Sequence, residues 1–302
     1  MFSVVIPVYN RPKELDRALS SLSKQLFKEF EVVICDDGST VDISYVVDKF
    51  STILNIKVIR IQNSGGPARP RNTAVRHCSY EWIAFLDSDD WWHVDKLQDV
   101  FNLINSGLKV DVIHHRLKVV TDSEQPVSLR ERLFYSHVGS DLGNASLLSL
   151  ATQGNGVALS SSVVRRDLFI KLSGMNESHD MAAYEDYDFW CKCAIHGASF
   201  RFIGRILGYY AISEDAIRLS PRAISRFNFF CNVNSFEGYE FSSKAISYQK
   251  YVRGVMLEAC GNNQKKALSQ FWLAHDLQGA QLNIKRIVYI IYLLFQIGRN
   301  KW

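Results

Sequence analysis

The first third of the chain alternates between short apolar runs and segments with helical spacing. Between the first two runs, apolar residues recur at the spacing of one face of a helix. This strand–helix–strand order with short connections predicts right-handed crossovers and a mainly parallel sheet with helices on both faces. The first two runs are predicted as buried strands, at Phe2–Val8 and Phe30–Cys35, and the next two as strands at Ile56–Ile61 and Trp82–Leu86.

After residue 110, the hydrophobic pattern predicts a few more strands and helices, followed by a mainly helical segment. We expect strands at Asp111–Val120, within 154–164 and at Phe200–Ile203, and helices at Arg166–Leu172 and from Tyr184 to near Gly197. From about residue 216 the pattern is helical and basic. The sequence therefore predicts an α/β domain over 1–215 and a helical C-terminal extension over 216–302.

Polar side chains follow each of the four predicted strands. Tyr9 follows the first, Asp36 and Asp37 the second, Asn63 the third, and an acidic cluster the fourth. Asn10 is in position to cap the first helix, which has Pro12 in its first turn. Open α/β sheets bind ligands along the carboxyl edge of their strands, so we expect one site there.

The acidic cluster is Asp87-Ser88-Asp89-Asp90, followed by Trp91 and Trp92. Crowded carboxylates raise one another's pKa unless a cation joins them. Hard carboxylate oxygens suit Mg²⁺ or Mn²⁺, which share their coordination with substrate phosphates. An Asp-x-Asp is also compatible with a solvated acidic turn before a helix, so this motif alone leaves both interpretations open.

Composition is that of a folded protein, with 47% hydrophobic and 22% charged residues. The last 102 residues hold 14 Lys/Arg and 6 Asp/Glu, whereas the first 200 hold 21 and 25. Such a basic end suits an anionic partner. The six cysteines lack zinc-site spacing, and we expect reduced thiols. No signal peptide and no apolar run of membrane-spanning length is evident.

Five segments carry a resemblance. The segments "VVIPVYNRPKELDRALSSL", "EVVICDDGS", "NSGGPARPRN", "WIAFLDSDDWWHVDKL" and "YEDYDFW" occur in this order. Together they resemble the family 2 glycosyltransferases, which are inverting nucleotide-sugar enzymes of the GT-A fold, over Phe2 to about Tyr210. The resemblance implies a GT-A catalytic domain and transfer of a sugar from a UDP-sugar to a glycan hydroxyl. It also implies bacterial surface-polysaccharide synthesis, such as O-antigen, capsule or lipooligosaccharide.

The resemblance assigns a nucleotide pocket to the first three strand ends. Pro7 and Tyr9 match residues that line the uracil pocket, where Tyr9 would stack on the base. Asp37 matches the acid that accepts the uracil N–H, whereas Asp36 is expected to hold its loop through backbone amides. Arg71 matches the arginine of the family's Ala-Arg-Asn; because this loop reads "ARPRN", Arg69 remains an alternative.

The acidic cluster also matches the family residue by residue. Asp87 and Ser88 match the ribose and phosphate side of the motif, and Asp89 matches the ligand of Mn²⁺ or Mg²⁺. Asp90 is expected to cap the helix that begins near Val94. The two tryptophans are expected to pack the sheet edge and one wall of the sugar pocket.

The remaining matched residues belong to the acceptor side. Asp186 matches the catalytic base, which takes the proton of the attacking hydroxyl. Glu185 is expected to touch the donor sugar. Asn155, between two glycines, matches a loop that lines the donor and acceptor pocket.

Partners and location follow from the resemblance and from the basic end. The apolar stretch Ile287–Ile297, flanked by Lys and Arg, is compatible with an interfacial helix on anionic lipid, and equally with packing on the core or on a second subunit of a homo-oligomer. We expect a cytoplasmic protein, peripheral on the inner face of the bacterial inner membrane, with an acceptor linked to undecaprenyl diphosphate or lipooligosaccharide.

Other classes of protein remain as alternatives. A catalytically silent nucleotide-sugar-binding subunit of the same fold would carry the same motifs. An aspartyl-phosphate phosphatase also has Asp-x-Asp after an apolar strand, but Trp91 stands where that class has Thr or Val. A dinucleotide dehydrogenase is disfavoured because no Gly-x-Gly-x-x-Gly follows the first strand. No nucleic-acid recognition motif accompanies the basic end.

Overall fold

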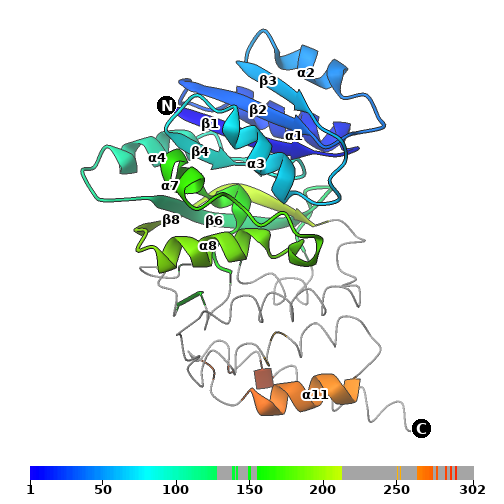
Figure 1. Cartoon of the computed structure of the whole chain (residues 1–302), viewed down its shortest axis with the longest axis vertical. Coiled ribbons are helices and arrows are strands. Elements are labelled where there is room, and N and C mark those ends of the chain that lie inside the picture. Colours follow the sequence, from blue (N-terminus) through cyan, green and yellow to red (C-terminus); the bar gives the residue numbers. More distant parts are fainter. Residues whose placement is uncertain are drawn as a thin grey trace.

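A computed structural model describes residues 1–127, 138–139, 141, 149–150, 155–212, 250, 252, 264–274, 277, 283, 286–287 and 290. Its centre is a sheet with the strand order β3-β2-β1-β4-β7-β6-β8-β5 (Figure 1). The described strands are β1 (Phe2–Val8), β2 (Phe30–Asp36), β3 (Ile56–Arg60), β4 (Trp82–Phe85), β5 (Trp91–Trp92), β6 (Val112–Thr121), β7 (Val163–Arg165) and β8 (Phe200–Ile212).

The sheet is mainly parallel, as the sequence predicts. Strands β1 to β4 pair in parallel, and so do β6 and β8, whereas β7 runs antiparallel to β4 and β6, and β5 runs antiparallel to β8. Two predictions of extent are wrong, and one strand was missed. The segment 154–164 contains a 3₁₀ turn, Leu159–Ser161, before the short β7, and β8 continues beyond Ile203 to Ile212. The missed strand is β5.

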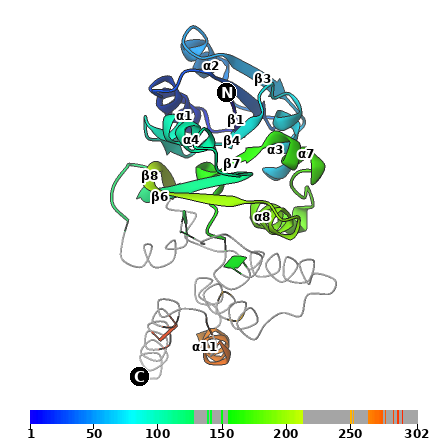
Figure 2. The ribbon, with the colours of Figure 1, turned by 90° about the vertical axis from the view of Figure 1, so that its left-hand side faces the viewer.

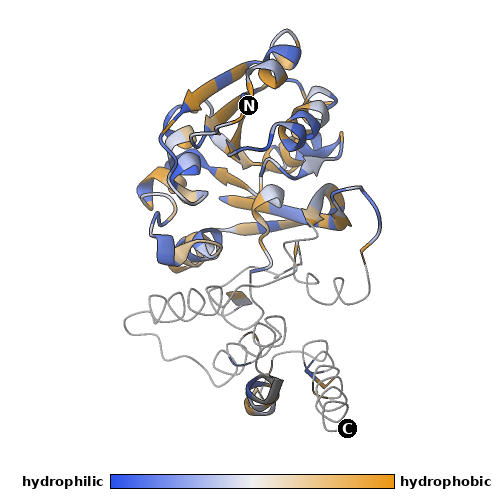
Figure 3. Ribbon diagram, turned by 90° about the vertical axis from the view of Figure 1, so that its right-hand side faces the viewer, coloured by the Kyte–Doolittle hydropathy of each residue, from blue (hydrophilic) through white to orange (hydrophobic). Residues whose placement is uncertain are grey.

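Helices cover both faces of the sheet, which confirms the α/β prediction (Figure 2). On one face, Leu19, Phe50 and Val100 pack into a core with the strands. On the other, Val75, Phe169 and Trp190 do the same. The strands consist largely of hydrophobic residues, whereas the helices carry both hydrophobic and hydrophilic residues (Figure 3). The described helices are α1 (Pro12–Ser23), α2 (Ser44–Phe50), α3 (Ala68–Arg76), α4 (Lys96–Ile104), α7 (Arg166–Lys171), α8 (Glu185–Ile195) and α11 (Gln264–Leu273).

The turn after β1 differs from the prediction in one residue. Pro12 opens α1 as expected, but Asn10 does not cap the helix. Asn10 lies in the left-handed region at φ +54°, a conformation that asparagine tolerates better than most residues. Its Oδ1 accepts hydrogen bonds from the backbone N–H groups of Thr40 (2.8 Å) and Val41 (3.1 Å). Asn10 thus ties the loop after β1 to the loop after β2, beside the expected site.

Most of the C-terminal extension lies outside the described residues. Helix α11 agrees with the helical pattern there, while the boundary at 215/216 and the role of Ile287–Ile297 stay predictions. None of the described helices has the length and apolar character needed to cross a membrane. The cysteines of the described ranges are unpaired and buried, as expected for reduced thiols: Cys35, Cys78, Cys191 and Cys193.

Candidate active site

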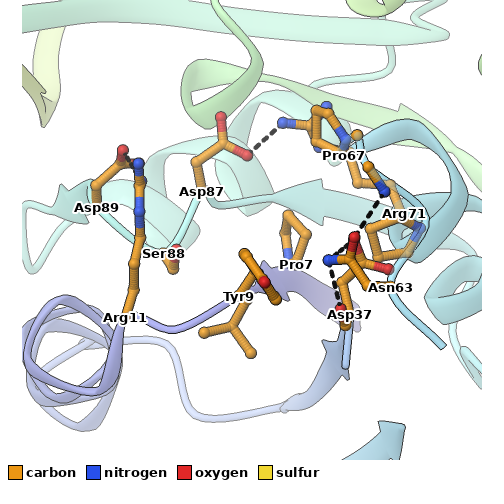
Figure 4. Close-up of a pocket in the computed structure, with 14 residues that line it drawn as sticks. Pro7, Tyr9, Arg11, Asp37, Asn63, Pro67, Arg71, Asp87, Ser88 and Asp89 are labelled. Carbon is orange, nitrogen blue, oxygen red and sulfur yellow. Dashed lines mark hydrogen bonds and ion pairs between the residues drawn. The ribbon is translucent and has the colours of Figure 1, made fainter. Parts of the chain in front are cut away.

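A cavity of about 460 Å³ opens at the carboxyl edge of β1 to β4 (Figure 4). Its walls come from the segments that follow each of these strands and from the start of α3. Seven of the predicted site residues line it together: Pro7, Tyr9, Asp37, Arg71, Asp87, Ser88 and Asp89. The four strand ends therefore border one cavity, and its role as a ligand site stays a prediction.

The end of the cavity near β1 and β2 offers an aromatic ring and a carboxylate. Tyr9 is 45% exposed, so its ring is available to a ligand and is not buried in a packed turn. The buried Asp37 accepts hydrogen bonds from the backbone N–H (2.9 Å) and hydroxyl (3.0 Å) of Ser64. Burial raises the pKa of Asp37, and the Ser64 bonds oppose this. A carboxylate has about four acceptor positions, so Asp37 keeps capacity for a ligand N–H.

Asp36 has the structural role that the sequence predicts. Its Oδ1 accepts the backbone N–H of Ser39 at 2.8 Å, and its Oδ2 lies 3.0 Å from the Arg60 guanidinium. Because both oxygens are engaged away from the cavity, Asp36 holds the loop that presents Asp37.

Arg71 joins the cavity to helix α8. Its side chain is buried, with Nη2 2.5 Å from Asp87 Oδ1 and Nη1 2.7 Å from Glu185 Oε1. These two carboxylates raise the pKa of Arg71 against the effect of burial. Arg69, the alternative, is exposed and lines a smaller neighbouring cavity. The geometry therefore favours Arg71 as the arginine that faces the main cavity.

Two arginines hold Asp89: Arg11, directly before α1, and Arg17, within α1. The Arg11 guanidinium forms an ion pair with the Asp89 carboxylate, and Arg17 Nη2 donates to the Asp89 backbone carbonyl at 2.7 Å. Burial raises the pKa of Asp89, while the charge of Arg11 lowers it. Arg11 is not among the site residues predicted from the sequence. Its position directly after "PVYN", at the carboxyl edge of the sheet, could have identified it as a site residue.

Asp90 does not cap the next helix, so that prediction is wrong. Helix α4 begins later, at Lys96, and has no side-chain cap. Asp90 is 1% exposed, and its Oδ1 accepts the backbone N–H of Ala211 on β8 at 2.9 Å. Burial, then the charges of Asp89 and Asp87, raise the pKa of Asp90 well above its ordinary value. Asp90 thus anchors the acidic loop to β8.

Buried polar groups hold the acidic loop in place through hydrogen bonds. Lys96 is fully buried and donates to the Ser160 carbonyl at 3.1 Å, while the Ser160 hydroxyl accepts the backbone N–H of Asp87 at 3.0 Å. Trp91 and Trp92 pack at the sheet edge as expected, and neither lines the main cavity or the smaller cavity beside Arg69. Their role as a wall of the sugar pocket stays a prediction.

The first turn of α8 carries the remaining predicted acids. Asp186 is half-buried and accepts hydrogen bonds from Asn155 Nδ2 (2.9 Å) and from the backbone N–H of Tyr187 (2.7 Å). Burial first, then the neighbouring Glu185, raise the pKa of Asp186 to about 7, while Arg71 opposes the shift. A carboxyl group with this pKa can accept a proton near neutral pH.

Asp186 and Asn155 do not line the main cavity. They are connected to it through Glu185, which pairs with Arg71 and also borders a second cavity of about 130 Å³. The two cavities share Gly66 and Pro67 in their walls, so they are neighbours. A continuous chain of ion pairs thus runs from Asp87 through Arg71 to the start of α8.

The carboxylates of the main cavity fit a divalent cation only with help from a ligand. Within the described ranges, no group of three or more His, Cys, Asp or Glu side chains is arranged to hold a metal ion. Asp87 and Asp89 nevertheless present hard oxygen donors to the cavity. Mg²⁺ and Mn²⁺ commonly take one or two carboxylates and complete their shell with phosphate oxygens and water. The donor set therefore suits an ion that arrives with a diphosphate.

Comparison with known proteins agrees with this geometry. The model of the family "Glycosyl transferase family 2" matches residues 3–172, so the chain belongs to this family. The poly(ribitol-phosphate) beta-N-acetylglucosaminyltransferase TarS of Staphylococcus aureus is 29% identical over 232 residues, which cover 76% of this chain and 38% of TarS. The Escherichia coli glucosyltransferase WfgD is 37% identical over 98 residues, which cover 32% of this chain and 38% of WfgD. The chain thus spans well under half the length of these relatives.

Solved structures show the same fold. TarS 1–349 in complex with UDP-GlcNAc has a TM-score of 0.62 at 20% identity and covers 99% of this chain and 92% of its own. The mannosyltransferase PcManGT from Pyrobaculum calidifontis, in complex with GDP-Man and Mn²⁺, has a TM-score of 0.64 at 17% identity. The match covers 100% of this chain and 87% of PcManGT. The predicted GT-A fold is confirmed, and the family assignment argues against the phosphatase alternative.

Proposed function

We propose that this protein is an inverting glycosyltransferase that moves a sugar from a UDP-sugar to a hydroxyl group of a bacterial cell-surface glycan. One observation carries the proposal. A single cavity joins an exposed aromatic ring and a buried carboxylate at one end to an Asp-x-Asp at the other, and Arg71 connects it to the acids of α8.

The groups near β1 and β2 support uracil as the base. The exposed ring of Tyr9 offers a stacking surface, and Asp37 offers an acceptor for the N–H that uracil carries and cytosine lacks at that edge. Solved structures of TarS with UDP and with UDP-GlcNAc contain the same class of ligand. Because PcManGT contains GDP-Man, guanine is the base to test against uracil.

The acidic loop supports binding of the diphosphate. In the proposal, Asp87 and Ser88 face the ribose and phosphates, and Asp89 holds Mn²⁺ or Mg²⁺ on the diphosphate. The bound ion would offset the negative charge that grows on the departing diphosphate. Arg17 and the buried Ser160 would keep the loop in position through their bonds to the backbone of Asp89 and Asp87.

Asp186 is the proposed general base. It would accept the proton of the acceptor hydroxyl as that oxygen attacks the anomeric carbon and the bond from this carbon to the phosphate oxygen breaks. Its raised pKa suits the task, and Asn155 would orient the carboxylate through its hydrogen bond. Glu185, which borders the smaller cavity beside the main one, would contact the donor sugar.

The proposed acceptor is a glycan linked to undecaprenyl diphosphate or lipooligosaccharide. The printed name of WfgD describes a UDP-Glc:alpha-D-GlcNAc-diphosphoundecaprenol glucosyltransferase, which acts on a lipid-linked acceptor. Such an acceptor would place the protein at the inner face of the bacterial inner membrane, where the basic C-terminal extension would meet anionic lipid.

Calorimetric titration with nucleotides tests the class of donor. In the presence of Mn²⁺, we expect UDP to bind more tightly than CDP or GDP, and we expect release of UDP from at least one UDP-sugar with a glycan acceptor. Preference for GDP would replace the uracil assignment. Binding of UDP without turnover of any UDP-sugar would favour the silent binding subunit over the enzyme.

Replacing Tyr9 with alanine should weaken UDP binding by about 1–3 kcal/mol, the usual contribution of one base stacked on an aromatic ring. The expected change is in the affinity for UDP, because the ring is exposed and removing it leaves no cavity in the core. Calorimetry of UDP in the presence of Mn²⁺ measures it. Tyr9→Phe keeps the ring and should bind UDP like the wild type; equal losses in both variants would argue against stacking.

A further inference from the structure

Both carboxylates of the Asp-x-Asp are paired with an arginine, but the two pairs differ in character. Arg71 is buried and bridges two acids, Asp87 and Glu185. The Arg11 side chain is 49% exposed, and Asp89 is its single ion-pair partner within the described ranges. Arg71 is therefore fixed by two charges and by packing, whereas Arg11 is held by one charge at the open side of the cavity.

Arg11 and a divalent cation need the same group. The guanidinium approaches Asp89 Oδ2 from the start of α1, and both residues line the main cavity (Figure 4). A carboxylate that is paired with a guanidinium is a weaker metal ligand, because the two cations repel each other at short distance. Arg17 holds the Asp89 backbone independently, so Asp89 stays in position when Arg11 moves.

We propose that Arg11 competes with the divalent cation for Asp89 and transfers to the diphosphate when the nucleotide binds. This inference rests on the proposed function. In the nucleotide-free protein, Arg11 neutralises Asp89 and keeps its affinity for the cation low. The phosphates then offer Arg11 an alternative anion in the same cavity, which frees the carboxylate for the ion. Metal binding is thereby coupled to nucleotide binding.

Titration of Mn²⁺ into the nucleotide-free protein tests the competition. Loss of one half-exposed ion pair corresponds to at most about 1 kcal/mol, so Arg11→Gln should bind Mn²⁺ about 5-fold more tightly than the wild type. The exposed Lys13 lies two residues away on α1, and Lys13→Gln removes the same charge without touching Asp89. This control should bind Mn²⁺ like the wild type.

Titration of UDP at saturating Mn²⁺ gives the second readout. Arg11→Gln should bind UDP about 3-fold more weakly, because the diphosphate loses one surface-exposed charge partner. A merely structural role would not strengthen Mn²⁺ binding and weaken UDP binding in one variant.

The outcomes separate this inference from the proposed function. If wild type and Arg11→Gln bind Mn²⁺ equally while the wild type binds UDP, the competition is wrong and the proposed function stands. An equal gain in Lys13→Gln would also overturn the competition, since general charge would explain it. If none of the proteins binds Mn²⁺ or UDP, the proposed function fails and this inference fails with it.

Discussion

Replacing Asp186 with asparagine should lower kcat by roughly 10²–10⁴-fold, the usual contribution of a positioned general base. The amide has nearly the shape of the carboxyl group but cannot accept the hydroxyl proton. UDP binding should be unchanged, because Asp186 does not line the main cavity. Steady-state kinetics and calorimetry with UDP measure the two effects separately. Asp180→Asn, an exposed acid in the segment before α8, is the matched control and should keep kcat.

The pH dependence of kcat/KM in the wild type and the same two variants checks the role of Asp186 as a base. The pKa of Asp186 is raised to about 7, mainly by burial and then by Glu185. The carboxyl group must be ionised to accept a proton, so kcat/KM should rise with pH through about 7 in the wild type and in Asp180→Asn. A wild-type profile that is flat between pH 5.5 and 8.5, or full activity of Asp186→Asn, would remove Asp186 from the chemistry.

Replacing Arg71 with methionine should destabilise the protein by about 3–5 kcal/mol, because it leaves Asp87 and the buried Glu185 without their shared counter-charge. For a domain of this size, that corresponds to a fall in Tm of about 10 °C. Thermal and denaturant unfolding measure the loss. The pKa of Asp186 should also rise further, since Arg71 is the charge that lowers it.

Two further variants show whether buried charge is the cause. Arg69→Met, in the same loop but exposed, should change stability little. Adding Glu185→Gln to Arg71→Met should restore part of the lost stability, because the buried acid is then neutral. If the double variant is less stable than Arg71→Met alone, lost packing and not unpaired charge explains the effect.

The local pattern of hydrophobic and polar residues was sufficient to predict the strands whose ends border the main cavity. Strands β1, β2 and β4 are short, mainly apolar and buried, whereas β3 alternates apolar and charged residues. A polar residue stands within three positions after the end of each strand, and the parallel sheet brings these ends together. The seven residues assigned to this edge from the resemblance therefore lie in one cavity. Their individual roles in binding and catalysis stay predictions.

Contacts between distant segments were the part that local pattern missed. Asp90 has the residue type of a helix cap, but its partner is Ala211 on β8, 121 residues away. Arg11 has the residue type of an exposed helix start, but its partner is Asp89, 78 residues away. Neither β5 nor the antiparallel β7 has enough length for a periodic signal, because each is defined by its pairing partner. These side-chain contacts and strand pairings form only in the assembled sheet, so the local sequence does not reveal them.

The walls of the main cavity come from residues 7 to 89, whereas Asp186 follows much later in the chain. Synthesis proceeds from the amino terminus, and folding generally begins before synthesis ends. A partly made chain therefore contains every group of the main cavity's lining while Asp186, the proposed proton acceptor, has not yet been translated. Under the proposed function, growth on the ribosome would complete the lining of the nucleotide pocket before it supplies the catalytic base.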